Sequence, residues 1–335
     1  LALGCSKTND SDNSNGAPNQ LTISSVVSTD GSGSVSFEAT ARNTTTYFFE
    51  LGNSENATSA DGKLTYQYTT PGTNTYVVTV KASNAAGQSI SKSTQVTVSV
   101  AGTGTGLIWS DEFNTSGAPD PTKWVYDIGK GDNGWGNNEL QYYTNRSENI
   151  SVQNGILKIT ARKENFSGSS FTSARIKSKG KFEFKYGRVE VSAKVPEGVG
   201  TWPAVWMLGA NIDAVPWPAC GEIDIMEHLG RDLNKIYGTL HYPGRSGGNA
   251  DGNTRLIQNA TTAFHKYSLD WKADMIRIYV DNQLIHSVNN SAALPFNSDF
   301  FLLINMAIGG NFAGAVDPAL ENAIFEVDYI RVYRD

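Results

Sequence analysis

The sequence predicts an all-β protein in which a small β-sandwich precedes a much larger two-sheet sandwich. Apolar and polar residues alternate in short runs along most of the chain, and turn-forming Gly, Asn, Asp and Pro separate these runs. No segment of useful length shows the helical period. The 335 residues are enough for two domains, and a Gly/Thr stretch at 101–106 interrupts the patterning between them as a linker.

The smaller sandwich is expected at residues 21–100. Its apolar runs lie at 21–23, 35–37, 47–49, 64–66, 76–80 and 95–98, as in an immunoglobulin-like domain. The segments 70–73, 76–80 and 82–87 together resemble the polycystic-kidney-disease (PKD) type of immunoglobulin-like module, although the acidic loop motif of that family is missing near 47–52. We find no catalytic constellation here, so we interpret the domain as a spacer, with glycan binding as the alternative.

The first 20 residues resemble the end of a bacterial lipoprotein signal followed by a flexible tether. The chain begins Leu-Ala-Leu-Gly-Cys-Ser, which would make Cys5 the acylated residue, and residues 6–19 are rich in Ser, Asn and Asp. We therefore expect a lipid anchor at Cys5 that holds the protein at a bacterial cell envelope, on the outer membrane or the cell surface. The second cysteine, Cys220, is interpreted as a packed free thiol, and no disulfide framework is expected.

Charge and composition limit the partners. A net charge of −6 and a pI near 5.3 argue against nucleic acid, because phosphate binding needs a basic surface. No stretch approaches the ~18 apolar residues of a membrane-spanning helix, so the expected membrane contact is the N-terminal lipid alone. Nothing in the sequence predicts an oligomer, and we expect a monomer.

Three carboxylates lie within six residues in the segment Gly-Glu-Ile-Asp-Ile-Met-Glu-His at 221–228. Their alternation with apolar residues predicts a β-strand on which Glu222 and Asp224 share a face. Glu227 follows Glu222 by five residues, an odd step that would turn it to the opposite face of a regular strand. One extra residue in a β-bulge would return it, so we predict a bulge near 225–226.

Crowded carboxylates suit glycoside hydrolysis. Neighbouring negative charges oppose one another's ionisation and raise at least one pKa. A glycosidase needs one carboxylate ionised as nucleophile or base and another protonated as acid. An exposed acidic strand or a calcium ligand set would explain the same residues. The preceding segment, however, places Trp202 and Trp206 four residues apart on one strand face, a pattern typical of a sugar-stacking platform, and Trp217 follows.

Taken together, these segments resemble glycoside hydrolase family 16. Residues 202–208 followed by 221–227 are most similar to the laminarinase-like β-glucanases of that family, which carry Glu-x-Asp-x-x-Glu, whereas lichenases and xyloglucan transglycosylases carry Glu-x-Asp-x-Glu. The resemblance implies a large concave β-jelly roll at residues 107–335 with a cleft across its concave sheet. Further matching segments lie at 109–113, 134–143, 173–177, 265–271 and 305–312.

The resemblance also implies roles for single residues. Glu222 corresponds to the nucleophile, Glu227 to the general acid/base, and Asp224 to a helper between them. Two of the implied sugar contacts have plainer interpretations, because Arg175 would also stabilise a strand and His241 would also suit a structural position. The implied substrate-binding residues are Trp202 and Trp206 on the glycone side, Arg175, Asn138 and His241 as polar contacts, and Trp217 as a further platform.

Many members of the family hold a structural calcium ion on the convex side. Glu112, the backbone carbonyl of Gly155 and Asp328 stand at the matching positions, and hard oxygen ligands suit this ion. Ordinary surface acids would explain the two carboxylates as well. Catalysis itself needs no cofactor, since two carboxylates suffice for retaining hydrolysis.

The expected function is that of an endo-acting, retaining β-glucanase that hydrolyses β-1,3-glucan of the laminarin type. Mixed-linkage β-1,3-1,4-glucan is the alternative main substrate, because enzymes of both preferences share the bulged motif, and algal galactans such as agar fit less well. Two other classes stay open at this point, a non-catalytic β-glucan-binding protein and a structural adhesin. Such binding proteins lack the catalytic glutamates, which are present here.

Overall fold

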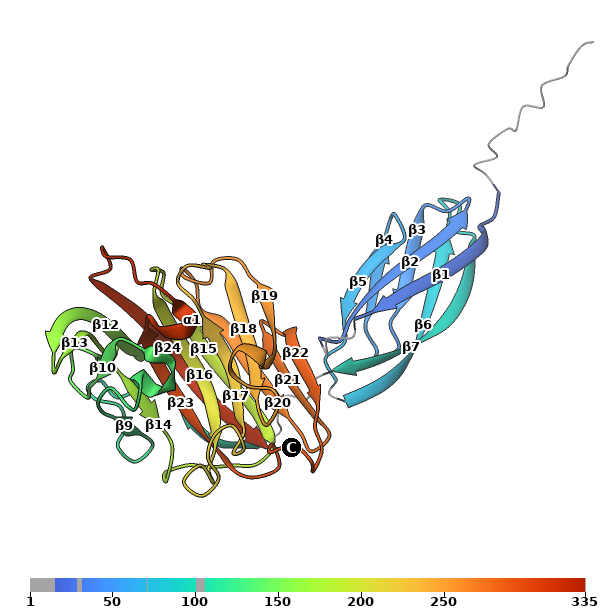
Figure 1. The fold of residues 1–335 in the computed structure, drawn as a ribbon. Coiled ribbons are helices and arrows are strands. Elements are labelled where there is room, and N and C mark those ends of the chain that lie inside the picture. Colours follow the sequence, from blue (N-terminus) through green and yellow to red (C-terminus); the bar gives the residue numbers. More distant parts are fainter. Residues whose placement is uncertain (1–15, 29–31, 71, 101–105, 335) are drawn as a thin grey trace, which may run out of the picture. The chain divides into compact units, whose positions relative to one another are not determined.

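The computed structural model describes most of the chain, and Cys5 lies outside the described part. Contacts between Cα atoms divide the chain into two units, Leu1–Ala101 and Gly102–Asp335. Within the described residues, no helix is long and apolar enough to cross a membrane. The described residues are 16–28, 32–70, 72–100 and 106–334 (Figure 1).

The first unit consists of two small antiparallel sheets that share one core. Alternating residues such as Val35 and Phe37 on one sheet, and Phe49 and Val78 on the other, are buried between them. One sheet has the order β1 (Asn19–Val27), β2 (Ser34–Arg42), β5 (Lys63–Gln67), and the other has the order β4 (Asn56–Ser59), β3 (Thr46–Glu50), β6 (Gly72–Ser83), β7 (Ser89–Val100). The first strand thus begins at Asn19, within the range that the sequence assigned to the tether.

The second unit contains a ten-stranded outer sheet. Its strands alternate between residues that face the core and residues that face solvent, as the sequence pattern indicates. The strand β8 begins at Gly106, which the sequence assigned to the linker. The order is β10 (Gln141–Tyr143), β13 (Ser169–Ser173), β12 (Ile156–Phe166), β24 (Asn322–Arg334), β15 (Gly187–Lys194), β20 (His265–Trp271), β21 (Met275–Val280), β22 (Gln283–Asn289), with β11 (Ile150–Gln153) on β12 and β8 (Gly106–Asp111) on β24.

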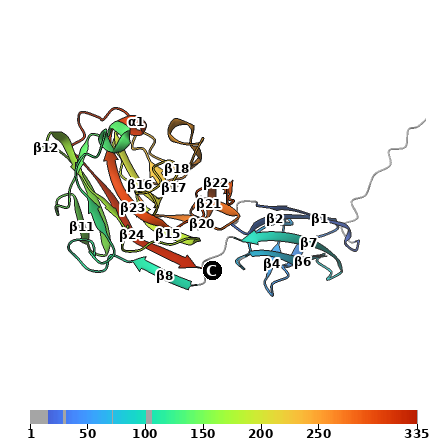
Figure 2. The same cartoon turned by 60° about the horizontal axis from the view of Figure 1, so that its bottom comes forward.

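A seven-stranded sheet forms the second layer of this unit and carries the carboxylate segment (Figure 1, Figure 2). Three short helical turns lie between strands of this unit, namely η1 (Gly134–Asn138), η2 (Gly247–Asn249) and α1 (Gly310–Ala313). The strand order is β19 (Asp251–Leu256), β18 (Lys235–His241), β17 (Glu222–His228), β16 (Thr201–Gly209), β23 (Phe300–Ile308), β14 (Arg175–Lys177), β9 (Val125–Asp127).

The predicted bulge in the carboxylate strand is confirmed. On one side of β17, Trp206 pairs with Asp224 while Val205 pairs with Met226, so Ile225 has no partner in the register. The register with β18 shifts between Asp224 and Glu227 in the same way. The extra residue turns Glu227 back to the face of Glu222 and Asp224, while the apolar side chains of the strand stay in the core.

Candidate active site

The three carboxylates of β17 open into one cleft of about 1100 Å³ on the seven-stranded sheet. Asp224 and Glu227 are only 4% and 7% exposed, and Glu222 is half-buried. The flanking strands hold this geometry, because β16 pairs with β17 on one side and β18 on the other. Trp202 and Trp206 lie on the cleft side of β16, as predicted from their spacing.

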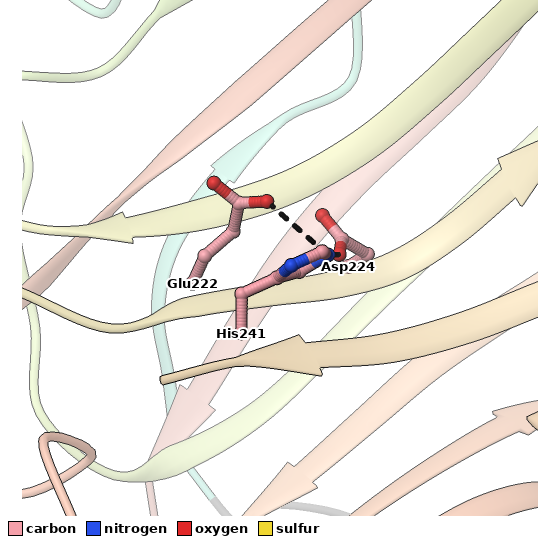
Figure 3. A group of neighbouring side chains, drawn as sticks. All are labelled: Glu222, Asp224 and His241. Carbon is pink, nitrogen blue, oxygen red and sulfur yellow. Dashed lines mark ion pairs between the residues drawn. The ribbon is translucent and has the colours of Figure 1, made fainter. Parts of the chain in front are cut away.

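Each carboxylate has a different set of polar neighbours. Glu227 accepts a hydrogen bond of 2.9 Å from Trp202 Nε1 and one of 3.3 Å from Thr239 Oγ1. His241 Nε2 lies 3.2 Å from Asp224 Oδ2 and 3.6 Å from Glu222 Oε1 (Figure 3). Asp224 Oδ2 is buried and has no hydrogen-bond partner within the described structure. Two hydrogen-bond donors thus hold Glu227, whereas Glu222 and Asp224 both lie beside the His241 ring.

Burial raises the pKa of Glu222, Asp224 and Glu227 to about 8 in each case. These values already include the negative charge of Asp224, which raises the pKa of Glu222 and Glu227, and the nearby His241, which lowers both. Hydrogen bonds from Trp202 and Thr239 also lower the pKa of Glu227. Three carboxylates in one poorly hydrated site oppose one another's ionisation, so the cluster retains protons at neutral pH.

This protonation pattern is the one that retaining glycoside hydrolysis uses. One carboxylate must attack the sugar as an anion, and a second must donate a proton to the departing oxygen before it accepts one from water. Glu222 and Glu227 stand at the two ends of the bulged strand and face the same cleft, with Asp224 between them. The structure therefore brings together in one cleft the three residues to which the sequence assigned these roles.

Comparison with known proteins agrees with the site. The sequence model of Glycosyl hydrolases family 16 matches residues 137–331, which is more than half of the chain. The chain belongs to glycoside hydrolase family 16. It is therefore a glycoside hydrolase that works with retention of configuration.

A relative and two solved structures each match about two thirds of the chain. A β-glucanase of Rhodothermus marinus is 44% identical over 244 residues, which span 68% of this chain and 85% of the relative. The solved laminarinase from Rhodothermus marinus has a TM-score of 0.66 at 42% identity, over 68% of this chain and 97% of that chain. The catalytic domain of an endo-1,3-β-glucanase (laminarinase) from Thermotoga petrophila gives 0.65 at 44% identity, with the same coverage.

One wall of the family 16 cleft is built around Arg175. Its guanidinium lies 4.6 Å from the ring centroid of Trp135 and 4.8 Å from that of Trp206. Arg175 Nε is also 2.9 Å from Asp127 Oδ2. Arg175 lines the cleft, as expected for a sugar contact. It also packs against the rings of Trp135 and Trp206, as expected for a structural residue.

The other implied sugar contacts occupy different places. Trp217 lines the cleft, is 43% exposed, and lies 5.8 Å from the His241 ring at a tilt of 44°. Asn138 must be corrected, because it is exposed, donates a hydrogen bond to Asn311 and does not line the cleft. Its neighbour Asn137 lines the cleft instead. The turn η1 decides this, since several of its residues adopt positive φ and rotate the side chains away from a regular order.

Sequence reasoning gave no role to Glu139, a buried carboxylate of the same cleft. It accepts hydrogen bonds from Gln141 Nε2 at 2.6 Å and from the Tyr143 hydroxyl at 3.2 Å, and burial raises its pKa. Asn305 Nδ2 donates to Tyr143, and Trp206 Nε1 donates to Asn305. The segment 134–143 was recognised as a family match, but nothing in it shows that Tyr143, the partner of this carboxylate, meets a strand some 160 residues later.

Glu222, Asp224 and His241 together could hold a metal ion, because their ligand atoms lie within 4.8 Å of one another. The hydrogen bonding of His241 does not fit this use. The backbone N–H of Gly247 donates to His241 Nδ1 at 3.1 Å, so the proton of the neutral ring is on Nε2. A metal ligand at Nε2 needs a bare nitrogen, and the ring offers an N–H there.

Glu112, one of the three residues of the expected calcium site, forms an ion pair with Arg331. Arg331 donates to both carboxylate oxygens of Glu112, at 2.9 and 2.8 Å, and lowers the pKa of this group. The Glu112 side chain therefore does not fit as a calcium ligand. The strand register brings Glu112, the turn at Gly155 and Asp328 to neighbouring rows of the outer sheet, where carbonyl oxygens and the Asp328 carboxylate would be the donors.

Cys220 is confirmed as a packed free thiol. It is fully buried just before β17, and burial raises its pKa to about 11. A thiol with this pKa stays protonated at neutral pH and is a poor nucleophile. It therefore has no part in the chemistry of the neighbouring carboxylates.

Proposed function

We propose that this family 16 enzyme is an endo-acting β-1,3-glucanase that cleaves polysaccharides of the laminarin type within the chain. One observation carries the endo mode. The cleft crosses six neighbouring strands, about 24 Å at the usual strand spacing, and the catalytic strand is the third of the six. A substrate can therefore extend on both sides of the scissile bond. The lining residues of these strands include Thr254, His241, Glu222, Trp206, Asn305 and Arg175, in the order β19 to β14.

The proposed mechanism is a double displacement. Glu222 attacks the anomeric carbon while Glu227 gives its proton to the departing glycosidic oxygen, and a glycosyl-enzyme forms on the Glu222 oxygen. The Glu227 carboxylate then accepts a proton from water, and the resulting hydroxide releases the sugar with its original configuration. Asp224 opposes a second negative charge next to either glutamate, which helps Glu227 to keep its proton in the first step.

The β-1,3 linkage is proposed because the similar proteins include laminarinases and a β-glucanase. Mixed-linkage β-1,3-1,4-glucan remains the alternative main substrate. A non-catalytic glucan-binding protein or an adhesin is disfavoured, because the free energy needed to bury three carboxylates in one cleft has no use without chemistry.

The test is an incubation with laminarin, lichenan, barley β-glucan, carboxymethyl cellulose and agarose. Reducing ends and oligosaccharide ladders are measured over time, with Glu222→Gln and Glu227→Gln as controls. We expect ladders of mixed length from laminarin, lost in both variants, and a slower reaction with the mixed-linkage glucans. Activity that survives Glu222→Gln, or no cleavage of any glucan, would contradict the proposal.

We further propose that Cys5 is lipidated and that the first unit holds the catalytic domain away from a bacterial envelope as a PKD-type spacer. The support is the lipoprotein-like start of the sequence and the two small sheets of the first unit. Expression in a bacterial host with labelled palmitate should label the membrane-bound protein, and Cys5→Ser should remove the label and release the protein. Binding of the separate first unit to insoluble glucan would favour the glycan-binding alternative.

A calcium ion near Asp328, held by this carboxylate and by the backbone carbonyls of Glu112 and Gly155, is proposed as a stabilising ligand only. It would join the first strand of the larger unit to the last. Added calcium should raise the melting temperature of the larger unit, and EGTA should reverse this. The variant Asp328→Asn should lose most of the calcium response, whereas an unchanged melting temperature in the wild type would refute the site.

A further inference from the structure

His241 lies opposite the nucleophile and contacts the polar groups of two segments. The strand register pairs His241 of β18 with Glu222 of β17. Its Nε2 faces Asp224 Oδ2 at 3.2 Å and Glu222 Oε1 at 3.6 Å, while its Nδ1 accepts the backbone N–H of Gly247 at 3.1 Å (Figure 3). The imidazole therefore bridges the catalytic strand and the loop that follows β18.

The Gly247 bond determines which ring nitrogen carries the proton. A backbone N–H can only donate, so Nδ1 must present its lone pair, and the neutral ring holds its hydrogen on Nε2. Nε2 is also the ring nitrogen that lies beside the two carboxylates. Protonation of both nitrogens would set an Nδ1–H against the Gly247 N–H and lose this hydrogen bond. A neutral ring that keeps the Gly247 bond is therefore a donor at Nε2.

The loop that supplies Gly247 is braced by a second network. Asp251 Oδ2 accepts a hydrogen bond of 2.6 Å from the Tyr242 hydroxyl, and Asp251 Oδ1 lies 3.3 Å from Arg245 Nη2. His286 Nε2 of β22 lies 3.1 Å from the same Oδ1. The backbones of Tyr242 and Arg245 also pair with each other. These contacts connect both ends of the loop to the sheet and hold the Gly247 amide in place.

We propose that His241 is a positioning residue that keeps a permanent Nε2–H donor against Asp224 and Glu222, with its tautomer set by the Gly247 amide. This inference rests on the proposed function, because it assigns Glu222 as the nucleophile. It is an alternative to the expectation that His241, which lines the cleft, contacts the sugar, and the position of Nε2 beside the two carboxylates favours it. Asp224 Oδ2 is buried and has no hydrogen-bond partner among the described residues. Nε2 of His241 lies beside it at 3.2 Å.

The donor favours the ionised form of the nucleophile. An N–H dipole at Nε2, 3.6 Å from Glu222 Oε1, stabilises the carboxylate, so loss of this donor should raise the pH at which the nucleophile ionises. Removing the donor also frees Asp224 and Glu222 to move apart or to reorient. The titratable and charged groups that face this site are Glu222, Asp224 and Glu227 of β17, Cys220 before it, His241 of β18 and Arg175 of β14.

The test compares three substitutions on laminarin and on an aryl β-laminarioside with a good leaving group. The amide nitrogen of Gln reaches the place of Nε2, that of Asn reaches the place of Nδ1, and Phe keeps the ring without a donor. We expect His241→Phe and His241→Asn to lower kcat about 10- to 100-fold with little change in KM, and to move the acidic limb of the pH profile upward. We expect His241→Gln to recover most of the rate.

A sugar contact would give a different result, namely a raised KM with an unchanged kcat and an unmoved acidic limb, and that result would overturn the proposal. Equal loss in the Gln and Phe variants, with both folded by circular dichroism, would also overturn it. Cleavage of laminarin by the wild type is measured in the same series, so failure of the proposed function is seen separately.

A second readout does not depend on activity. The chain has four histidines, so the ring nitrogens can be observed in the 15N-histidine protein and His241 can be assigned from the His241→Gln spectrum. The expected finding for the neutral His241 ring is hydrogen on Nε2 and none on Nδ1. A neutral ring with its hydrogen on Nδ1 would refute the tautomer assignment.

Discussion

The indole Nε1–H of Trp202 donates a hydrogen bond of 2.9 Å to Oε1 of Glu227. The platform residue is thereby joined to the acid/base residue, and the bond lowers the pKa of the Glu227 carboxyl. Trp206, the second platform residue, donates instead to Asn305 Oδ1 at 2.7 Å. Two tryptophans that look equivalent in the sequence therefore differ in their effect on the chemistry.

The Trp202→Phe variant should change the pH profile. Loss of the donor raises the pKa of Glu227, so the alkaline limb, which reports the acid form, should move to higher pH while kcat falls about tenfold. Trp206→Phe is the matched control, because its indole N–H does not contact a catalytic carboxylate. Initial rates on laminarin from pH 4 to 10 provide the measurement. An equal shift in both variants would show that the hydrogen bond has no specific effect.

The two glutamates should respond differently to an external nucleophile. In Glu227→Ala the cleft loses its acid/base, so azide can take the place of water and give a β-glycosyl azide from an aryl glycoside. In Glu222→Ala azide can enter from the side of the missing nucleophile and give the α-anomer. NMR of the products distinguishes the two anomers. The opposite assignment of anomers would reverse the roles of Glu222 and Glu227.

The variant Asp224→Asn should be more stable than the wild type at pH 8. The folded-state pKa of Asp224 is raised to about 8 from an ordinary value of 3.8, so its contribution to stability is complete below pH 4 and is lost as the pH rises toward 8. Asparagine does not titrate, and we expect a gain of about 1–2 kcal/mol at pH 8 and almost none at pH 4. Calorimetry of the larger unit at both pH values measures this difference.

The control for that experiment is Asp120→Asn, since Asp120 is only half-buried and its pKa is lowered by hydrogen bonds from Thr122. It should show no gain at pH 8. A stability gain in Asp224→Asn that is the same at both pH values would mean that packing, and not the buried charge, is the cause.

Gly221 should tolerate substitution far less well than Gly244, although both have a φ of +82°. A Cβ at Gly221 would lie 2.9 Å from Phe300 Cζ and 3.1 Å from Pro295 Cγ, whereas nothing lies within 4 Å at Gly244. Both alanine variants carry backbone strain of about 1–3 kcal/mol. Gly221→Ala should lose about 1–3 kcal/mol more and should displace Glu222, with a loss of kcat. Urea unfolding and laminarin assays compare the pair, and equal stability would contradict the packing argument.

The sequence by itself determined the sheets and the catalytic strand. Alternating side chains report which face of a strand is buried, and the odd step from Glu222 to Glu227 demands an extra residue if both carboxylates are to share a face. The tryptophan platform followed from the same two-residue period. These features are local, because the alternation of one strand is set by its own backbone geometry.

Only the tertiary structure decided which polar group meets which. Asn137 replaces Asn138 in the cleft because positive φ values in the turn η1 rotate the side chains, a backbone choice that residue types do not reveal. Glu139 is joined to a strand far along the chain through Tyr143, which donates to Glu139 and accepts from Asn305. The donor role of His241 depends on one amide of a loop, at Gly247. Hydrogen bonds are directional and act over about 3 Å. Which groups form them is therefore decided only when the folded chain has placed both partners.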